Sequence, residues 1–250
     1  AVRGVADATA HRLVVPTPDR LLVLDLDTGH EVAQAPLDDG ANVLALPDQL
    51  VLAGPLSVRS FVPWERAYES LLAHLAAHPL DPRPGLALAH LAASADQPDA
   101  VVEGARAALD ALARIPAADP RADAAQREVF DQLLAFARVS SSLDLPLRED
   151  LLRSAATIST NPAQEVAYHL ALGSLHEDAG RPDEAIRHYQ AVLTSPALAS
   201  QLYTEGESAR QAGLEAQRRL AAVVERHGPE VYAAFDASAA REFAALVAQP

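Results

Sequence analysis

The sequence contains no cysteine, no methionine and no lysine, so all 20 basic residues are arginine. Without cysteine there is no thiolate nucleophile, no disulfide and no thiolate metal site. Without lysine there is neither a Schiff-base amine nor the lysine of a phosphate-binding loop. Gly-x-Ser-x-Gly and dinucleotide-binding motifs are missing as well. These absences exclude several enzyme classes and predict a chain that is not an enzyme.

Positive charge is also scarce, because 20 basic residues stand against 34 acidic ones and the formal net charge is −14. Proteins that bind nucleic acids or anionic membranes carry a basic face, so we expect neither partner. No apolar run approaches the ~20 residues of a membrane-spanning helix, and no membrane-spanning segment is expected. Because the chain begins at Ala1 and lacks methionine, we expect it to be an excised or processed part of a longer protein.

Residues 1–62 have the pattern of short antiparallel strands separated by turns. Tight turns are indicated by Pro, Asp and Gly, as at Asp27-Thr28-Gly29, where glycine supplies a positive φ. The expected strands are His11–Val15, Arg20–Leu26, Glu31–Ala35, Asn42–Leu46, Gln49–Ala53 and Ser57–Val62. Such meanders are the unit of a propeller or a sandwich.

Beyond Pro63 the apolar residues recur with helical spacing. The expected helices are Trp64–His78, Pro84–Ala95, Pro98–Arg114, Ala122–Ser140, Leu147–Ser159, Pro162–Ala179, Pro182–Leu193, Ser200–Arg226 and Asp236–Ala248. The change from strand to helix is expected between Phe61 and Glu65. We expect Trp64 to be buried there as an apolar plug.

The segment RLLVLDLDTGHEVAQ resembles a blade of the quinoprotein-type (PQQ-like) β-propellers. The matching residues are Leu24, Asp25, Thr28, Gly29 and Glu31. The family usually places a tryptophan just after the turn, where this chain has Ala33. Relatives that bind pyrroloquinoline quinone hold it in a funnel built from many blades. About two blades cannot close a propeller, so we expect no cofactor here.

The segment AYHLALGSLHEDAGRPDEAIRHYQAVLTSP resembles the tetratricopeptide repeat (TPR). The resemblance rests on Leu172-Gly173 in the first helix, Gly180 in the turn, and Ala185 and Tyr189 in the second helix. Small residues allow helices to approach closely where they cross. We therefore expect Gly173 and Ala185 to face each other.

The resemblance is incomplete in two ways. His169 and His176 occupy positions where the repeat commonly has aromatic residues. An earlier copy keeps the helix pair and several small or apolar residues but has Val101 in place of the second-helix alanine; its other matching residues are Leu88, Ala89, Leu91 and Pro98. The spacing between the copies is not a multiple of the usual repeat length. The repeat stack is therefore expected to be irregular.

Two patterns of metal-binding type are present, each with a simpler structural interpretation. His74 and His78 have the i, i+4 spacing of metal-binding helices but lack a third ligand, and Leu75 stands where a general base would be. The alternating oxygen residues of the segment 25–31 resemble part of a calcium loop, namely Asp25, Asp27, Gly29 and Glu31. A hairpin turn explains these residues equally, and we expect no metal.

Adjacent carboxylates are the remaining candidates for acid–base chemistry. They occur as Glu177-Asp178 and Asp183-Glu184. Consecutive helical positions point in different directions, and acidic residues are favoured in the first turn of a helix. We interpret both pairs as surface residues without a catalytic role.

The sequence thus predicts a mixed all-β plus all-α fold. Partial propeller blades over residues 1–62 are followed by an irregular TPR-like α-helical repeat stack over residues 63–250. The whole resembles large bacterial propeller–TPR fusion proteins, which favours an extracytoplasmic location. The unpaired strand edges of residues 1–62 are expected to pair with upstream blades or with a second chain.

The expected function is a non-catalytic protein–protein interaction or scaffold module, the C-terminal part of a larger propeller–TPR protein. The family resemblance implies a groove that binds a protein or peptide, here lined by Leu170, Ser174, Glu177 and Asp178. Acidic groove residues favour a basic partner. Two alternatives remain open: an accessory C-terminal part of a propeller enzyme such as a quinone-dependent dehydrogenase, or a structural subunit of an envelope assembly.

Overall fold

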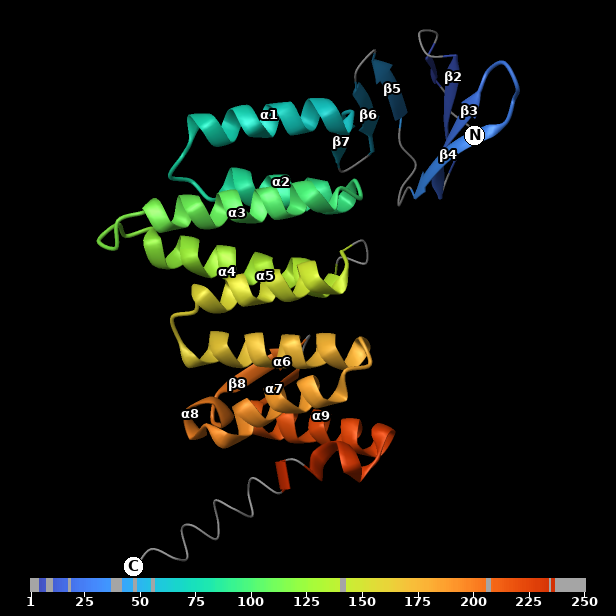
Figure 1. Cartoon of the computed structure of the whole chain (residues 1–250). Helices are drawn as coiled ribbons and strands as arrows, with labels where there is room; N and C mark the ends of the chain where they lie inside the picture. The colour runs from blue at the N-terminus through green and yellow to red at the C-terminus, as the bar shows by residue number, and fades with distance from the viewer. Residues whose placement is uncertain are drawn as a thin grey trace, which may run out of the picture. The chain divides into compact units, whose positions relative to one another are not determined.

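The chain forms two compact units, 1–73 and 74–250, in a computed structural model (Figure 1). Each unit is described by itself. The residues that the structure describes are 5–7, 11–17, 19–36, 42–46, 49–54, 57–139, 143–205, 208–233 and 235–236. The fold is mixed, as predicted: small antiparallel sheets are followed by a stack of helices.

The first unit contains two antiparallel meanders. The first sheet has the order β1-β2-β3-β4, with strands β1 (Val5–Asp7), β2 (Arg12–Pro16), β3 (Arg20–Asp25) and β4 (Glu31–Pro36). The second has the order β5-β6-β7, with strands β5 (Asn42–Leu46), β6 (Gln49–Ala53) and β7 (Val58–Phe61). The six predicted strands are confirmed to within one residue at each end, and among the strands described in this unit only the short β1 was not predicted.

The turn between β3 and β4 is built as its sequence predicts. Gly29 has a φ of 72°, and its N–H donates to the carbonyl oxygen of Asp25 over 2.8 Å. The Asp25 Oδ1 atom accepts bonds from the N–H groups of Asp27 and Thr28 and from the Thr28 hydroxyl, at 2.8–3.0 Å. These bonds, chiefly that from the Thr28 backbone, lower the pKa of Asp25. The Asp-x-Asp-Thr-Gly segment therefore serves the turn.

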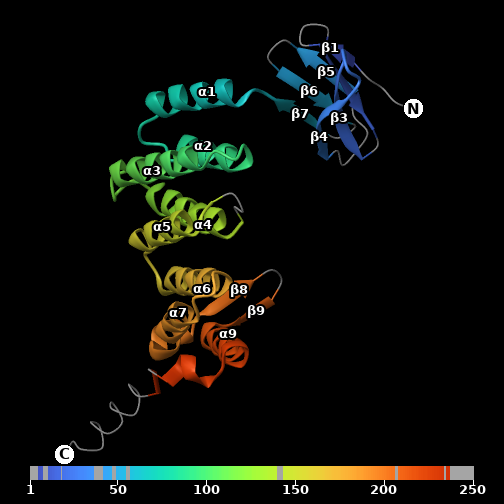
Figure 2. The same ribbon diagram turned by 45° about the vertical axis from the view of Figure 1, so that its right-hand side comes forward.

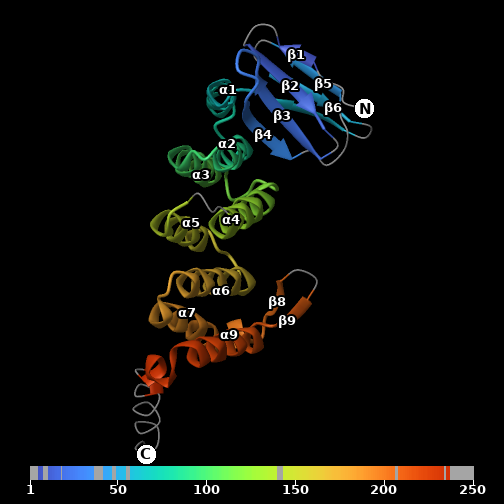
Figure 3. The same cartoon turned by 90° about the vertical axis from the view of Figure 1, so that its right-hand side faces the viewer.

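The two sheets pack face to face around a small apolar core (Figure 3). Its buried members come from both sheets and are Val14, Leu21, Val43 and Leu52. Because successive side chains of a strand point to opposite faces, the sequence neighbours of these residues point away from the core. The unit is thus a two-layer arrangement, and a closed propeller is not formed by the described strands.

The strand-to-helix change lies where it was predicted, because β7 ends at Phe61 and α1 (Trp64–Ala77) begins at Trp64. The prediction that Trp64 is buried is wrong. Its side chain is half-buried, with its ring centroid 5.5 Å from that of Tyr68 one turn along the same helix. No residue of α1 is buried, and the division between the two units falls within this helix.

Antiparallel helix pairs make up most of the second unit (Figures 1 and 2). They are α2 (Arg83–Ser94) with α3 (Pro98–Arg114), α4 (Ala122–Val139) with α5 (Leu145–Thr157), and α6 (Pro162–Asp178) with α7 (Pro182–Thr194). Asp144 and Asn161 cap α5 and α6 by accepting N–H bonds of 3.0 Å. Helices α3, α6 and α7 begin at the prolines where they were predicted to begin, whereas α5 begins two residues before its predicted start, directly after its cap.

The segment 200–226 is not the single long helix that was predicted. The short α8 (Pro196–Ala199) leads into a hairpin of β8 (Leu202–Glu205) and β9 (Ser208–Gln211), and α9 (Ala212–His227) follows. Alternation along β8 buries Tyr203 and exposes Leu202 and Thr204, as an extended strand requires. Burial of the Tyr203 ring thus favours the strand over the helix. After α9 the chain forms the 3-10 turn η1 (Pro229–Tyr232). The last predicted helix, Asp236–Ala248, lies almost wholly outside the described residues.

Glycines lie where paired helices cross, but the α6–α7 crossing differs from the prediction. A Cβ atom on Gly173 would lie 2.4 Å from the Cε1 atom of Tyr189, so this glycine faces an aromatic ring and not Ala185. Ala185 is fully buried one turn earlier in α7. In the first pair the glycines Gly85 and Gly104 face each other's helix backbones.

Candidate interaction sites

The predicted groove residues do not lie together on one open surface. Leu170 is fully buried in the core, Ser174 is half-buried, and Asp178 is exposed at the end of α6. The Glu177 carboxylate accepts a bond from the Arg226 guanidinium at 2.7 Å and from the Tyr189 hydroxyl at 3.1 Å. Leu170 therefore has no surface to offer a partner, and Glu177 already has two partners within the chain.

The β8–β9 hairpin region supplies the side chain that covers this part of α6. Tyr203 belongs to the same core cluster as Leu170, and its hydroxyl lies 3.2 Å from a guanidinium nitrogen of Arg138 on α4. Arg219 of α9 places its guanidinium 6.0 Å from the Tyr203 ring centroid and donates to the Leu170 carbonyl oxygen at 3.5 Å. Tyr203 and Arg219 thus belong to the packing around Leu170.

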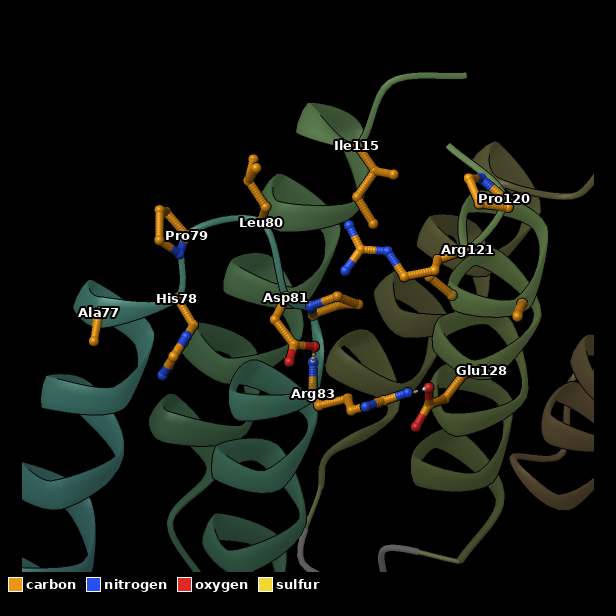
Figure 4. A pocket seen from close by; sticks show the side chains of 13 residues that line it. Ala77, His78, Pro79, Leu80, Asp81, Arg83, Ile115, Pro120, Arg121 and Glu128 are labelled. Atoms are coloured by element: carbon orange, nitrogen blue, oxygen red, sulfur yellow. Dashed lines mark hydrogen bonds and ion pairs between the residues drawn. The ribbon is translucent and has the colours of Figure 1, made fainter. Parts of the chain in front are cut away.

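A pocket of about 570 Å³ lies elsewhere in the second unit (Figure 4). It is lined by residues of the segment that joins α1 to α2, by the end of α3, and by the start of α4. Figure 4 shows Leu80 and Ile115 at one end and the Arg83–Glu128 pair at the other. The Asp81 carboxylate accepts the N–H of Arg83 at 3.0 Å and so forms part of the pocket wall.

The charges near this pocket are mostly neutralised in pairs. Arg83 Nε lies 3.5 Å from a Glu128 oxygen, and Arg121 binds both carboxylate oxygens of Asp119 at 3.0 and 2.7 Å. The bonds from Arg121 hold the pKa of Asp119 at about 2, so this carboxylate stays ionised above that pH. Among the described residues that line the pocket none carries a hydroxyl or thiol. The pocket therefore combines apolar side chains with an ion pair at its edge, a lining that is common in binding pockets.

The outer face of the β5–β7 sheet is a second candidate surface, because five of the eight described residues on it are apolar. The strand register brings the described outward residues of the three strands together: Asn42, Leu44, Leu46, Gln49, Val51, Ala53, Val58 and Ser60. None of these is charged, and the side chains of Leu44 and Val58 are 52% and 73% exposed. A sheet with one solvated face normally alternates apolar and polar residues. This sheet does not.

The outward residues of β2 and β3 repeat the pattern. Leu13 lies beside Leu24 and Val15 beside Leu22, all on the face opposite the core residue Val14, and all four are half-buried. Strands with long apolar runs are typical of sheets that are covered on both faces. The outer face of this sheet is therefore apolar along β2 and β3 at these positions, and it becomes polar toward β4, where Gln34 accepts a bond from Arg20 at 3.2 Å.

The two metal-type patterns of the sequence lie at the end of the surface helix α1 and in the turn after β3. His74 and His78 are exposed, with ring centroids 4.5 Å apart. No group of three or more His, Cys, Asp or Glu within the described part of the chain could hold a metal ion.

The adjacent carboxylates of α7 lie at the surface or in an ion pair. Glu184 pairs with Arg187 at 2.9 Å, and Asp183 is exposed in the first turn of α7.

Sequence reasoning missed the most buried charge among the described residues of the second unit, Glu215 of α9. Its side chain is 3% exposed and bound by three arginines: Arg218 at 2.5 Å, Arg219 at 2.7 Å and Arg210 at 3.3 Å. Hydrogen bonds, that from Arg218 first, lower the pKa of Glu215 to about 2. The i, i+3 and i, i+4 spacing of Glu215 with the first two arginines is a sequence signal that could have found it.

Among the helices that the structure describes, none is both long and apolar enough to cross a membrane. Comparison with models of protein families, with curated proteins and with solved structures gives no match for this chain. The resemblances to blades and repeats therefore rest on the residues quoted above.

Proposed function

We propose that this chain is a non-catalytic protein–protein interaction module, in which a segment of PQQ-like propeller is joined to an irregular TPR-like stack. The observation that carries the proposal is the apolar, uncharged outer face of the β5–β7 sheet. Exposed apolar surfaces of soluble proteins are commonly interaction sites. The apolar outward residues of β2 and β3 in the other sheet support a role as inner layers of a longer series of packed sheets.

The helical unit supports the second half of the proposal. Its three antiparallel pairs have the up-and-down arrangement that the repeat resemblance implies, and glycines lie at two of the crossings. Because the hairpin covers α6, we propose that a partner uses the α2–α4 part of the stack, where Leu91 is 43% exposed. The net charge of −14 favours a basic partner segment.

The sheet surface can be tested with the double variant Leu44→Lys/Val58→Lys. The wild-type chain is expected to bind an apolar-surface dye and to self-associate in sedimentation velocity, and the double variant is expected to lose both. The matched control is His30→Lys, which adds charge at an exposed position of the same unit. A monomeric wild-type chain without dye binding would overturn the role of this face.

The partner's charge can be tested by fluorescence anisotropy with two labelled peptides of equal length, one rich in arginine and one rich in glutamate. The arginine-rich peptide is expected to bind, with an affinity that falls as salt is added, because surface charges are screened. The glutamate-rich peptide should not bind. Equal binding of both peptides, or binding of neither, would contradict a basic partner.

A further inference from the structure

Three histidines meet between α6 and α7. Two of them stand at positions where the tetratricopeptide repeat commonly has aromatic residues. We call His169, His176 and His188 the histidine cluster. The Nδ1 atoms of His169 and His188 lie 3.1 Å apart, so one ring donates a hydrogen bond and the other accepts it. The ring of His176 is stacked on that of His188, with centroids 5.6 Å apart and an angle of 10° between the planes. His188 of α7 therefore bridges two histidines of α6.

The cluster is enclosed by α5 as well as by its own helices. His176 is 5% exposed, and its Nδ1 atom is buried without a hydrogen-bond partner among the described residues. The nearest carboxylate oxygen, Oε1 of the buried Glu149, is 3.7 Å away and already accepts from Arg181 at 3.0 Å. Arg153 binds the other Glu149 oxygen at 2.6 Å. Glu149 is thus neutralised by two arginines before it can pair with His176.

The other groups that face the cluster act in opposite directions. Glu165 of α6 favours a charged His169, while Glu149 and Glu184 favour a charged His176. Arg153 and Arg187, together with the two other histidines, disfavour a charged His188, and Arg153 and Arg181 disfavour a charged His176. Tyr168 packs its ring 4.9 Å from His169 and 6.0 Å from His188, measured between centroids. The charges that act on His188, the bridging residue, come from Arg153, Arg187 and the two other histidines, and each of them disfavours its protonation.

We propose that the histidine cluster is a pH-sensitive contact, whose neutral imidazoles hold α7 against α6 and whose protonation releases α7 together with α9, which packs on it. The hydrogen bond between His169 and His188 needs one deprotonated nitrogen as acceptor. Protonation of both rings removes that acceptor and places two positive charges in contact. Protonated His176, which is stacked on His188, and the guanidinium groups of Arg153 and Arg187 add to the repulsion.

The pH window follows from the difference in the histidine pKa values between the folded and the unfolded chain. Burial is the first cause that lowers the pKa of all three histidines, and that of His188 falls to about 4. An unfolded histidine gains its proton near pH 6.5, so the unfolded chain binds more protons between about pH 6.5 and about pH 4. The stabilisation is therefore fully present above this window and is lost as the pH falls through it.

Thermal unfolding of the whole chain at several pH values tests the proposal with His188→Gln. The wild-type midpoint is expected to fall by roughly 5 °C more than that of the variant between about pH 7 and about pH 5. The matched control, His90→Gln on an exposed position of α2, should follow the wild type. Parallel pH profiles for wild type and His188→Gln would overturn the proposal.

Hydrogen exchange on the unmodified chain gives a second test that does not depend on a variant's folding. After correction for intrinsic rates, peptides from α6 and α7 should lose protection at about pH 5, while peptides from α2 and α3 should keep it. Equal loss along the whole helical unit, or unchanged protection of α6 and α7, would show that the cluster does not act as a pH-sensitive contact.

Discussion

The α2–α3 pair and the α6–α7 pair use glycine at their crossings in different ways. A Cβ atom on Gly104 would lie 2.5 Å from the backbone nitrogen of Ala89, so in α2–α3 two helix backbones approach each other directly. A Cβ atom on Gly173 would instead meet the Tyr189 ring, so in α6–α7 a large side chain fills the space over the glycine. The comparison shows that one small residue can serve backbone contact in one pair and side-chain insertion in the next.

Of three substitutions at these two crossings, Gly104→Ala should lower the free energy of unfolding most. The new methyl group would overlap backbone atoms of α2, which cannot rotate away, so α2 and α3 must separate. We expect a net loss of about 2–3 kcal/mol in the free energy of unfolding, since overpacking exceeds the ~1 kcal/mol that alanine gains over glycine in a helix.

Urea unfolding followed by far-ultraviolet circular dichroism measures this loss. Ala87→Leu, at an exposed position of α2, is the control and should change stability little. A Gly104→Ala chain as stable as the wild type would mean that the two backbones are not in contact.

Gly173→Ala should have a smaller effect, because its obstacle is a side chain. We expect a loss of about 1–2 kcal/mol, and in the Tyr189→Leu background we expect most of this loss to disappear. The non-additivity of the double variant measures how far the ring is responsible. Additive effects would show that the cost arises elsewhere in the crossing.

Glu177→Gln should have the smallest effect of the three. The change removes the ion pair with Arg226 and weakens the acceptor of the Tyr189 hydroxyl, the ring that lies over Gly173. We expect a loss of about 1 kcal/mol in the free energy of unfolding, because Glu177 is largely buried at this contact.

The adjacent Asp178→Asn is the matched control for Glu177→Gln. Asp178 is exposed, and removal of its charge should change stability by less than about 0.5 kcal/mol. Equal effects of the two substitutions would indicate that Glu177 contributes no more than a surface charge does.

Local signals in the sequence predicted most helices and strands but not which side chains pack against them. Proline and capping residues such as Asp144 and Asn161 mark helix starts, and Gly29 marks the hairpin, because each acts on backbone groups within a few residues. The partner of Gly173 and the covering of Leu170 were not predictable in this way. Both depend on Tyr side chains whose direction is set by packing with distant elements.

The candidate sites divide along the same line. His74 and His78 have the i, i+4 spacing of metal-binding helices but were interpreted as structural residues, and both side chains lie at the surface. The histidine cluster joins α6 to α7, and Glu149 reaches it from α5, so no single periodic pattern reveals it. His169 and His176 differ in the sequence only by standing where the repeat commonly has aromatic residues, and no sequence signal marks His188.

The sequence by itself determined the strands of the first unit, the helix pairs of the second and the change between them after Phe61. These depend on periodicity, turn residues and caps, which act locally. Only the tertiary structure decided that the segment after α8 is a hairpin, that Tyr203 packs into the same core as Leu170, and that the apolar outward residues of β5, β6 and β7 lie together on one face. The reason is physical: burial of a ring or alignment of a face depends on residues that are distant in sequence and adjacent only after folding.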